Sequence, residues 1–229
     1  MHTLTKLFVS FTAMFLGGSA SAASLSVSPI RLDLRHPDNS SRIVLRNDGA
    51  RPMTAQVRVF KWSIVDGDDY YEEAPDIVVT PPIVSLAAKS DFNVRILRTT
   101  GAPPAGEMAY RVVIDEVPEG PSAARASGVT IAMRYKVPLF VTGGSTTPPQ
   151  ITWRTRQVGG KTVLVGTNSG QTHARIANLT IGKTRVGNGL QGYILGNSSR
   201  NFPVPGGIRA VGPISVDTDQ GTLHALVAQ

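Results

Sequence analysis

The sequence predicts an all-β protein made of two immunoglobulin-like β-sandwich domains. Three observations support this prediction. Apolar and polar residues alternate with a period of two along many short segments, clusters of Gly, Pro, Asn and Asp separate those segments, and no segment keeps a helical period long enough for a helix. The TGGSTTPP run near the middle has the composition of a linker and divides the segments into two groups.

The first 22 residues have the organisation of a secretory signal peptide. A weakly basic start precedes an apolar run from Leu7 to Leu16, and Ala20-Ser21-Ala22 supplies the small residues of a cleavage site. The apolar run is too short to span a bilayer. We therefore expect cleavage after Ala22 and export to the periplasm, without insertion into a membrane.

The first domain is expected over residues 23–142 and contains seven predicted strands, a number typical of an immunoglobulin-like sandwich. At Pro29 the apolar positions change phase, from Leu25 and Val27 before it to Ile30, Leu32 and Leu34 after it. This change predicts that the segment crosses from one sheet to the other. The predicted strands are Leu25–Leu34, Ser41–Asn47, Met53–Ile64, Asp76–Val79, Asp91–Arg98, Met108–Glu116 and Val129–Val141.

The last of these strands is long and has two different faces. One face carries the apolar side chains, and the other carries Arg134 and Lys136. A long strand of this kind is either paired within a sheet or forms an edge that can receive a strand from a partner. In the second case the protein would bind other proteins through its backbone.

The second domain is expected over residues 150–229, after a linker at 143–149. This domain is shorter than the first and richer in Gly, and its strand pattern is weaker, but it still fits a second sandwich. The predicted strands are Gln150–Gln157, Lys161–Asn168, Arg175–Ile181, Gly192–Leu195, Asn201–Val204 and Thr222–Val227.

Composition excludes several classes of protein. The chain has no Cys, so disulfides and thiolate chemistry are excluded. The formal net charge is +7, but the Lys and Arg residues are scattered at strand spacing and form no dense cluster. We therefore expect no nucleic-acid partner, and a basic patch that binds carboxylates is the better interpretation.

No catalytic or metal-binding constellation is present in the sequence, so we expect neither an enzyme nor a cofactor. The histidines left after cleavage are His36, His173 and His224, and none has the spacing of a metal-ligand motif. Gly187, Gly189 and Gly192 spell GxGxxG, but a strand and a turn follow them instead of the helix that a dinucleotide site requires.

Five blocks of the first domain resemble, in order, the N-terminal domain of PapD-like periplasmic pilus chaperones. The resemblance covers Ser24 to Val141, and the block from Glu107 to Pro118 is its most specific part. The Ala-Tyr-Arg core and the Pro-Leu-Phe-Val ending resemble the archaic, Csu-type branch. The blocks are SLSVSPIRLDL, IVLRNDGARPMTAQVRVFKW, TPPIVSLAAKSDFNVRILR, EMAYRVVIDEVP and GVTIAMRYKVPLFV.

The resemblance implies an L-shaped pair of domains and a chaperone that lends its long strand to a pilin or coat-type subunit lacking a last strand. It also implies delivery of that subunit to an outer-membrane usher. By position, two cations would anchor the terminal carboxylate of the subunit, and an apolar row would fill its groove. The residues concerned are Arg31 and Lys136 as anchors, Arg95 and Arg111 as secondary anchor candidates, and Val129, Ile131, Met133 and Tyr135 in the donated strand.

The sequence departs from the family pattern at the end of the long strand. The classical branch of the family carries an Arg there that helps to lock the two domains together, whereas this chain has Phe140. Glu107 is the expected partner in that lock. The substitution leaves an apolar contact as the alternative to a charged lock between the domains.

Two other classes of function remain open. A structural surface protein, such as a pilin or adhesin, is one, but a pilin should carry a donor extension before its first core strand, and this strand begins soon after Ala22. An envelope hydrolase or sugar-binding protein is the other. It would need a nucleophile and base, or a stacking platform, and Trp62 and Trp153 are the only tryptophans.

Overall fold

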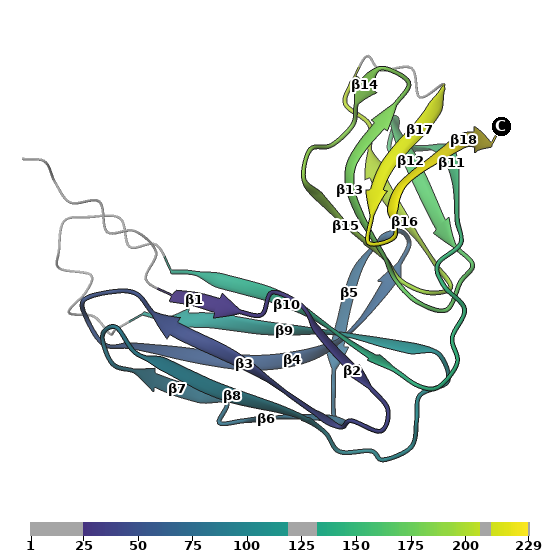
Figure 1. Cartoon of the computed structure of the whole chain (residues 1–229). Helices are drawn as coiled ribbons and strands as arrows, with labels where there is room; N and C mark the ends of the chain where they lie inside the picture. The colour runs from purple at the N-terminus through teal and green to yellow at the C-terminus, as the bar shows by residue number, and fades with distance from the viewer. Residues whose placement is uncertain (1–24, 119–131, 207–211, 229) are drawn as a thin grey trace, which may run out of the picture.

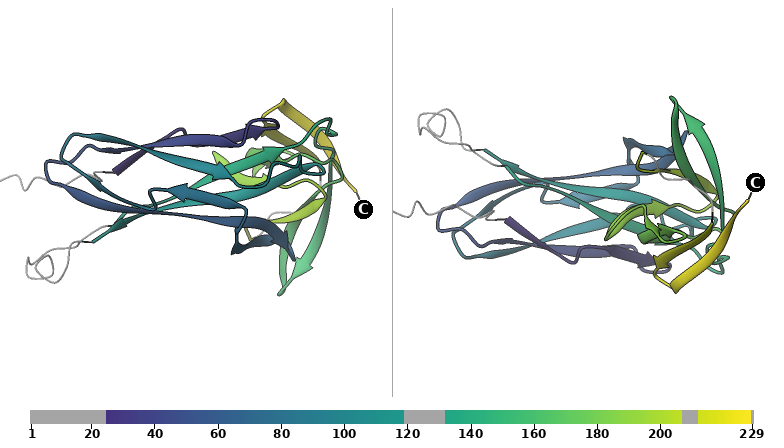
Figure 2. Two further views of the ribbon diagram at one scale, coloured as in Figure 1. Left: turned by 90° about the horizontal axis from the view of Figure 1, so that it is seen from below. Right: turned by 90° about the horizontal axis from the view of Figure 1, so that it is seen from above.

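The computed structural model describes residues 25–118, 132–206 and 212–228, and within those ranges every regular element is a β-strand. The strands form two bodies that meet at a steep angle, so the molecule has the shape of an L (Figure 1). Views from below and above place the second body beyond one end of the first (Figure 2). No helix among the described residues could cross a membrane.

The first body contains the strands β1 to β10, arranged in two sheets. One sheet has the order β1-β3-β8-β6, and the other has the order β2-β10-β9-β4-β5 with β7 also paired to β4. The bounds are β1 Leu25–Ser28, β2 Leu32–Arg35, β3 Ser40–Asn47, β4 Met53–Val65, β5 Asp68–Glu73, β6 Ile77–Thr80, β7 Ile83–Leu86, β8 Asp91–Arg98, β9 Glu107–Val117 and β10 Arg134–Thr142.

The core of the first body lies between these two sheets. Ile43 on β3 and Val94 on β8 meet Val112 and Ile114 on β9, and all four side chains are buried. Because residues alternate between the faces of a strand, the neighbouring side chains of Arg111 and Val113 on β9 lie on the other face of their sheet. That outer face forms the floor of the angle between the two bodies.

The crossing predicted at Pro29 is confirmed. β1 pairs with β3 in one sheet, and β2 pairs with β10 in the other. Leu32 and Leu34 enter the core as expected, whereas Ile30, at the crossing itself, is 80% exposed. The Ser28–Pro29 bond is cis, as is the Thr80–Pro81 bond.

The second body contains the strands β11 to β18 in one sheet with the order β14-β13-β17-β18-β11-β12-β16, and β15 also pairs with β13. Leu164 on β12 and Ile176 on β13 lie far apart in this strand order but share a single buried core. The sheet therefore folds back on itself. The bounds are β11 Ile151–Val158, β12 Lys161–Asn168, β13 Ala174–Ile181, β14 Thr184–Arg185, β15 Leu190–Ile194, β16 Ser198–Pro203, β17 Pro213–Thr218 and β18 Gly221–Ala228.

The structure corrects several predicted elements. β5, β7, β14 and β17 were not predicted from the sequence. β5 has the sequence DDYYEE, which lacks apolar alternation, and it forms because the tight turn at Asp66 and Gly67 folds it back onto β4. Within the described residues, β10 begins at Arg134, and the predicted start of the long strand at Val129 and Ile131 lies outside those residues.

Candidate functional site

The two bodies meet through a buried aromatic cluster. Trp62 on β4, Ala109 on β9 and Phe140 on β10 come from the first body, and Tyr193 and Leu195 come from the second. The ring centroids of Trp62 and Tyr193 lie 5.8 Å apart in an edge-on arrangement, which is a favourable geometry for two aromatic rings. Burial of these side chains at the angle of the L opposes free movement of the two bodies.

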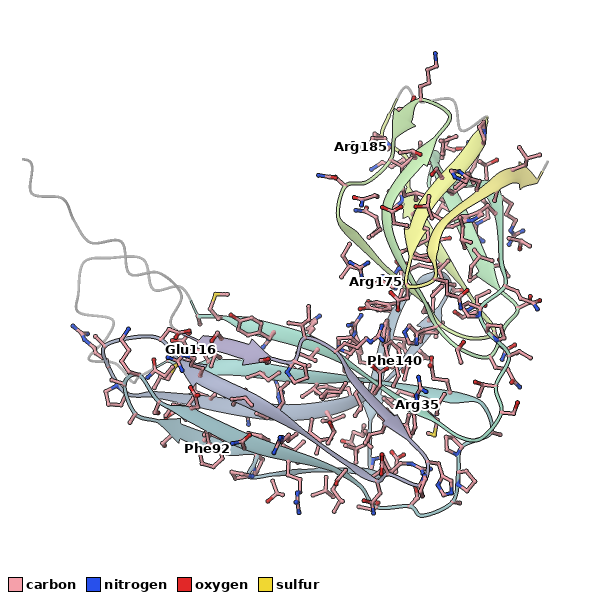
Figure 3. The ribbon with its side chains drawn as sticks, in the orientation of Figure 1. Arg35, Phe92, Glu116, Phe140, Arg175 and Arg185 are labelled. Carbon is pink, nitrogen blue, oxygen red and sulfur yellow. The ribbon has the colours of Figure 1, made fainter. Side chains whose placement is uncertain are left out.

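Phe140 and Glu107 both contact His173 across this junction. The rings of Phe140 and His173 are stacked, with centroids 3.5 Å apart and planes within 8°. The Glu107 carboxylate accepts hydrogen bonds of 2.9 Å from the backbone N–H of His173 and from its Nδ1. Because a carboxylate can only accept, Nδ1 carries the hydrogen. Figure 3 shows Phe140 at the inner angle of the L.

This contact answers the question that the departure at Phe140 raised. Phe140 makes an apolar contact across the junction, and Glu107 does take part in joining the two bodies. The third member, His173, was not predicted from the sequence, because it lies on the loop between β12 and β13 and belongs to no recognisable motif.

Arg31 holds two carboxylates, one from each body. Its Nε donates to Asp33 over 2.9 Å, and its Nη1 donates to Asp219 over 2.6 Å. Burial alone would lower the pKa of Arg31, but Asp33 and Asp219 raise it above its ordinary value. The side chain is 38% exposed, so the guanidinium remains accessible to a ligand.

Lys136 lies on β10 and is exposed to solvent, with its Nζ 5.2 Å from the ring centroid of Tyr71. No carboxylate of the described residues lies within ion-pair distance of it. β2 and β10 run parallel, with Leu32 opposite Leu139, so Arg31 and Lys136 both precede the paired stretch. The structure therefore places two cations at the same end of that pairing.

Arg111, also on the floor of the angle, is packed against aromatic rings. Its guanidinium carbon lies 3.7 Å from the ring centroid of Trp62 and 5.6 Å from that of Tyr193. Burial lowers the pKa of Arg111, an effect that Tyr71 and Asp69 partly oppose. Its Nε is buried without a hydrogen-bond partner in the described residues. This guanidinium is much less accessible than that of Arg31.

The other predicted site residues are more dispersed. Arg95 lies on β8 in the opposite sheet, where its register partners are Arg42 and Thr80, so the structure does not bring it to the junction. Tyr135 packs against the first core, and its hydroxyl donates to the carbonyl of Leu25. Met133 pairs with Glu116 through its backbone.

One edge of β10 is open over its first half. β9 pairs with all of β10 from Arg134 to Thr142, whereas β2 pairs only from Leu139 onward. Within the described part of the chain, no strand covers the other edge from Arg134 to Pro138. An uncovered edge presents unpaired backbone donors and acceptors, and it can therefore accept one more strand.

A hairpin from the first body forms a second, polar connection. Asp69 on β5 accepts hydrogen bonds from Trp62 Nε1 over 2.9 Å and from Arg200 Nη1 over 2.6 Å. At the tip of the hairpin, the backbone N–H of Asn201 donates to the carbonyl of Gly67 over 3.1 Å. The hairpin therefore covers part of the edge of β16.

Among the described residues, no group of three His, Cys, Asp or Glu side chains could hold a metal ion.

A family model described as "Pili and flagellar-assembly chaperone, PapD N-terminal domain" matches residues 24–144. A comparison with curated proteins found no match. Among solved structures, the chain is similar to a chain of the CsuC–CsuE chaperone–tip adhesion subunit pre-assembly complex from the archaic chaperone–usher Csu pili of Acinetobacter baumannii. The identity is 26%, the TM-score is 0.74, and the match covers 90% of this chain and 100% of that chain.

Two further matches show the same fold at lower identity. One is to the Salmonella enterica SafA pilin in complex with the SafB chaperone, with 18% identity, a TM-score of 0.67 and coverage of 91% of this chain and 99% of that chain. The other is to the E. coli chaperone DraB, with 24% identity, a TM-score of 0.62 and coverage of 90% and 98%. The matches extend over both bodies and not over the first alone.

Proposed function

The chain belongs to the family of pili and flagellar-assembly chaperones that carry the PapD N-terminal domain, and from this premise we propose that it binds pilus subunits by lending them a strand. PapD-like chaperones are periplasmic. The family match favours a chaperone over a surface fibre subunit or an envelope hydrolase. Cleavage of a signal peptide after Ala22 and delivery of the subunit to an outer-membrane usher are parts of this proposal.

The open edge of β10 is the observation that carries the proposal. A subunit that lacks its last strand exposes an apolar groove and an unpaired strand edge, both of which promote aggregation. A strand of the subunit that pairs with β10 over Arg134–Pro138 would extend the six-stranded sheet into the subunit. The backbone supplies the ladder of hydrogen bonds, so one chaperone strand can serve subunits of different sequence.

Arg31 and Lys136 are the proposed anchor for the terminal carboxylate of the subunit. Lys136 has no ion-pair partner among the described residues, and Arg31 is accessible at the same end of the β2–β10 pairing. A carboxylate held by both would make charge-assisted hydrogen bonds and fix the register of the added strand. Arg111 is the weaker candidate because its guanidinium is buried between Trp62 and Tyr193.

The donated side chains are proposed to be Val129, Ile131 and Met133, which share one face of the predicted strand. Tyr135 follows on the same face, and its ring packs against the chaperone's own core. In this proposal, the apolar face of the strand contacts the groove of the subunit as far as Met133 and the core of the chaperone from Tyr135 onward.

The experiment begins with purification of the tagged protein from the periplasm and identification of the protein that accompanies it. That subunit is then expressed with and without the chaperone. We expect the subunit to be degraded or insoluble when the chaperone is missing. A subunit that stays equally soluble and intact without the chaperone would contradict the proposal.

The anchor has its own test in the double variant Arg31→Ala/Lys136→Ala. Loss of the charge-assisted hydrogen bonds should reduce the yield of complex at least about tenfold. The matched control is Arg42→Ala/Arg95→Ala, which removes two exposed cations from the opposite sheet of the same domain and should leave the yield unchanged. Equal yields from both double variants would refute the anchor and leave the strand exchange intact.

A further inference from the structure

Asp219 places a carboxylate from the second domain on the proposed anchor. It lies in the turn between β17 and β18, and its Oδ2 is 2.6 Å from Nη1 of Arg31. This is the contact that a terminal carboxylate of a subunit would have to make. The protein therefore occupies its own anchor with the same chemical group that the anchor is proposed to bind.

The guanidinium of Arg31 has limited room for a second carboxylate. It offers two edges for bidentate binding, one formed by Nε and Nη2 and one formed by Nη1 and Nη2. Asp33 already takes Nε, and Asp219 already takes Nη1. A terminal carboxylate can make two parallel hydrogen bonds to Arg31 only after one of these two aspartates withdraws.

Asp219 is the aspartate better placed to withdraw. Asp33 lies two residues from Arg31 along the same segment, so it stays close to the guanidinium whatever the second domain does. Asp219 reaches Arg31 from the second domain, as the first residue of a two-residue turn, and its side chain is 32% exposed. Water can therefore solvate the Asp219 carboxylate as soon as it leaves Arg31.

We propose that Asp219 is an internal competitor, which occupies Arg31 in the subunit-free chaperone and is displaced when the C-terminal carboxylate of a subunit binds. This inference rests on the proposed function, because it needs Arg31 to receive a carboxylate. It adds a consequence for the junction. Binding of a subunit breaks one ion pair between the domains, and the stacked contact of Phe140 with His173 remains to hold them.

The competition predicts a measurable change in affinity. An internal partner that occupies a site lowers its apparent affinity. The apparent affinity equals the intrinsic affinity multiplied by the fraction of time that the site is open. Ion pairs between partly exposed groups have coupling energies that correspond to a ratio of closed to open states between about 1 and about 4. Because the gain in affinity is one plus this ratio, removal of Asp219 should strengthen carboxylate binding about twofold to fivefold.

The test uses the mature full-length protein labelled with ¹⁵N-arginine, and the probe is the peptide acetyl-Val-Thr-Tyr with a free C-terminal carboxylate. Titrations follow the Nε–Hε NMR signal of Arg31, assigned by its loss in Arg31→Lys. We expect Asp219→Asn to bind this peptide about twofold to fivefold more tightly than the wild-type protein. Asp219→Ala provides the same test if the Asn variant does not fold.

The control variant is Asp217→Asn, which makes the same change of charge two residues away. Asp217 bonds Asn178 and Thr222 instead of a cation, so this variant should bind like the wild type. Equal or weaker binding by Asp219→Asn would overturn the inference. The same peptide with a C-terminal amide separates the two proposals, because equal binding of the amide by the wild type would refute the carboxylate anchor itself.

Discussion

Substitution of His173 by Ala tests the junction most sharply. The change removes the ring that stacks on Phe140 at 3.5 Å and the Nδ1–H that donates to Glu107 over 2.9 Å. Loss of a stacked pair costs about 0.5–1.5 kcal/mol. Loss of a hydrogen bond to a charged group costs about 1.5–3 kcal/mol. Because the backbone N–H still satisfies one oxygen of Glu107, we expect a decrease of about 2–4 kcal/mol in the free energy of unfolding.

Urea denaturation followed by tryptophan fluorescence gives that free energy, and small-angle X-ray scattering reports the angle between the domains. The matched control is His224→Ala, which removes an exposed histidine from β18 in the same domain and should change the stability by less than about 0.5 kcal/mol. If His173→Ala has the stability and the scattering profile of the wild type, the stacked contact does not hold the junction.

Two further predictions concern the hairpin formed by β4 and β5. Gly67→Ala should destabilise the protein by about 1–2 kcal/mol in urea denaturation, because Gly67 has φ +91° and a Cβ there would lie 2.1 Å from Asn201 Nδ2. Gly101→Ala, which meets open space, should stay close to the wild type, and equal losses in both variants would contradict this reasoning. Burial alone would raise the pKa of Asp69, but the ion pair with Arg200 lowers it below its ordinary value. A lowered pKa in the folded state means that the stability from Asp69 is present above about pH 4 and is lost as the pH falls through the folded value. Stability measured against pH should therefore fall more steeply below about pH 4 for the wild type than for Asp69→Asn, and parallel curves would refute the role of this ion pair.

The strands of the first domain were largely predictable because their cores impose alternation. Ser41–Asn47 and Asp91–Arg98 were located within one residue of β3 and β8, whose alternate residues are buried. The crossing at Pro29 could be predicted because a phase change moves the apolar face of a segment to the other sheet. β5 could not be predicted in this way, since its charged residues face solvent and the second domain instead of a core.

The site residues could be predicted only where their position along a strand determines the face of the sheet on which they lie. Lys136 was placed on the outer face of its strand by alternation, and the resemblance pointed to Arg31. The second domain's contribution could not be predicted, because His173 and Asp219 lie in loops and meet partners 66 and 188 residues away in the sequence. Arg95 shows why alternation alone is not enough. Alternation places Arg95 on an outer face of its sheet, but it does not indicate which of the two sheets faces the junction.

In the proposed mechanism, a strand of the subunit pairs with the open edge of β10. Hydrogen–deuterium exchange of the free chaperone and of its complex with the co-purifying subunit tests this pairing directly. We predict that the amides of Arg134–Val137 that point away from β9 become protected in the complex. The outer edge of β6, Ile77–Thr80, lies at the edge of the opposite sheet and should exchange at the same rate in both samples. Protection at β6 with no change along β10 would refute the proposed pairing.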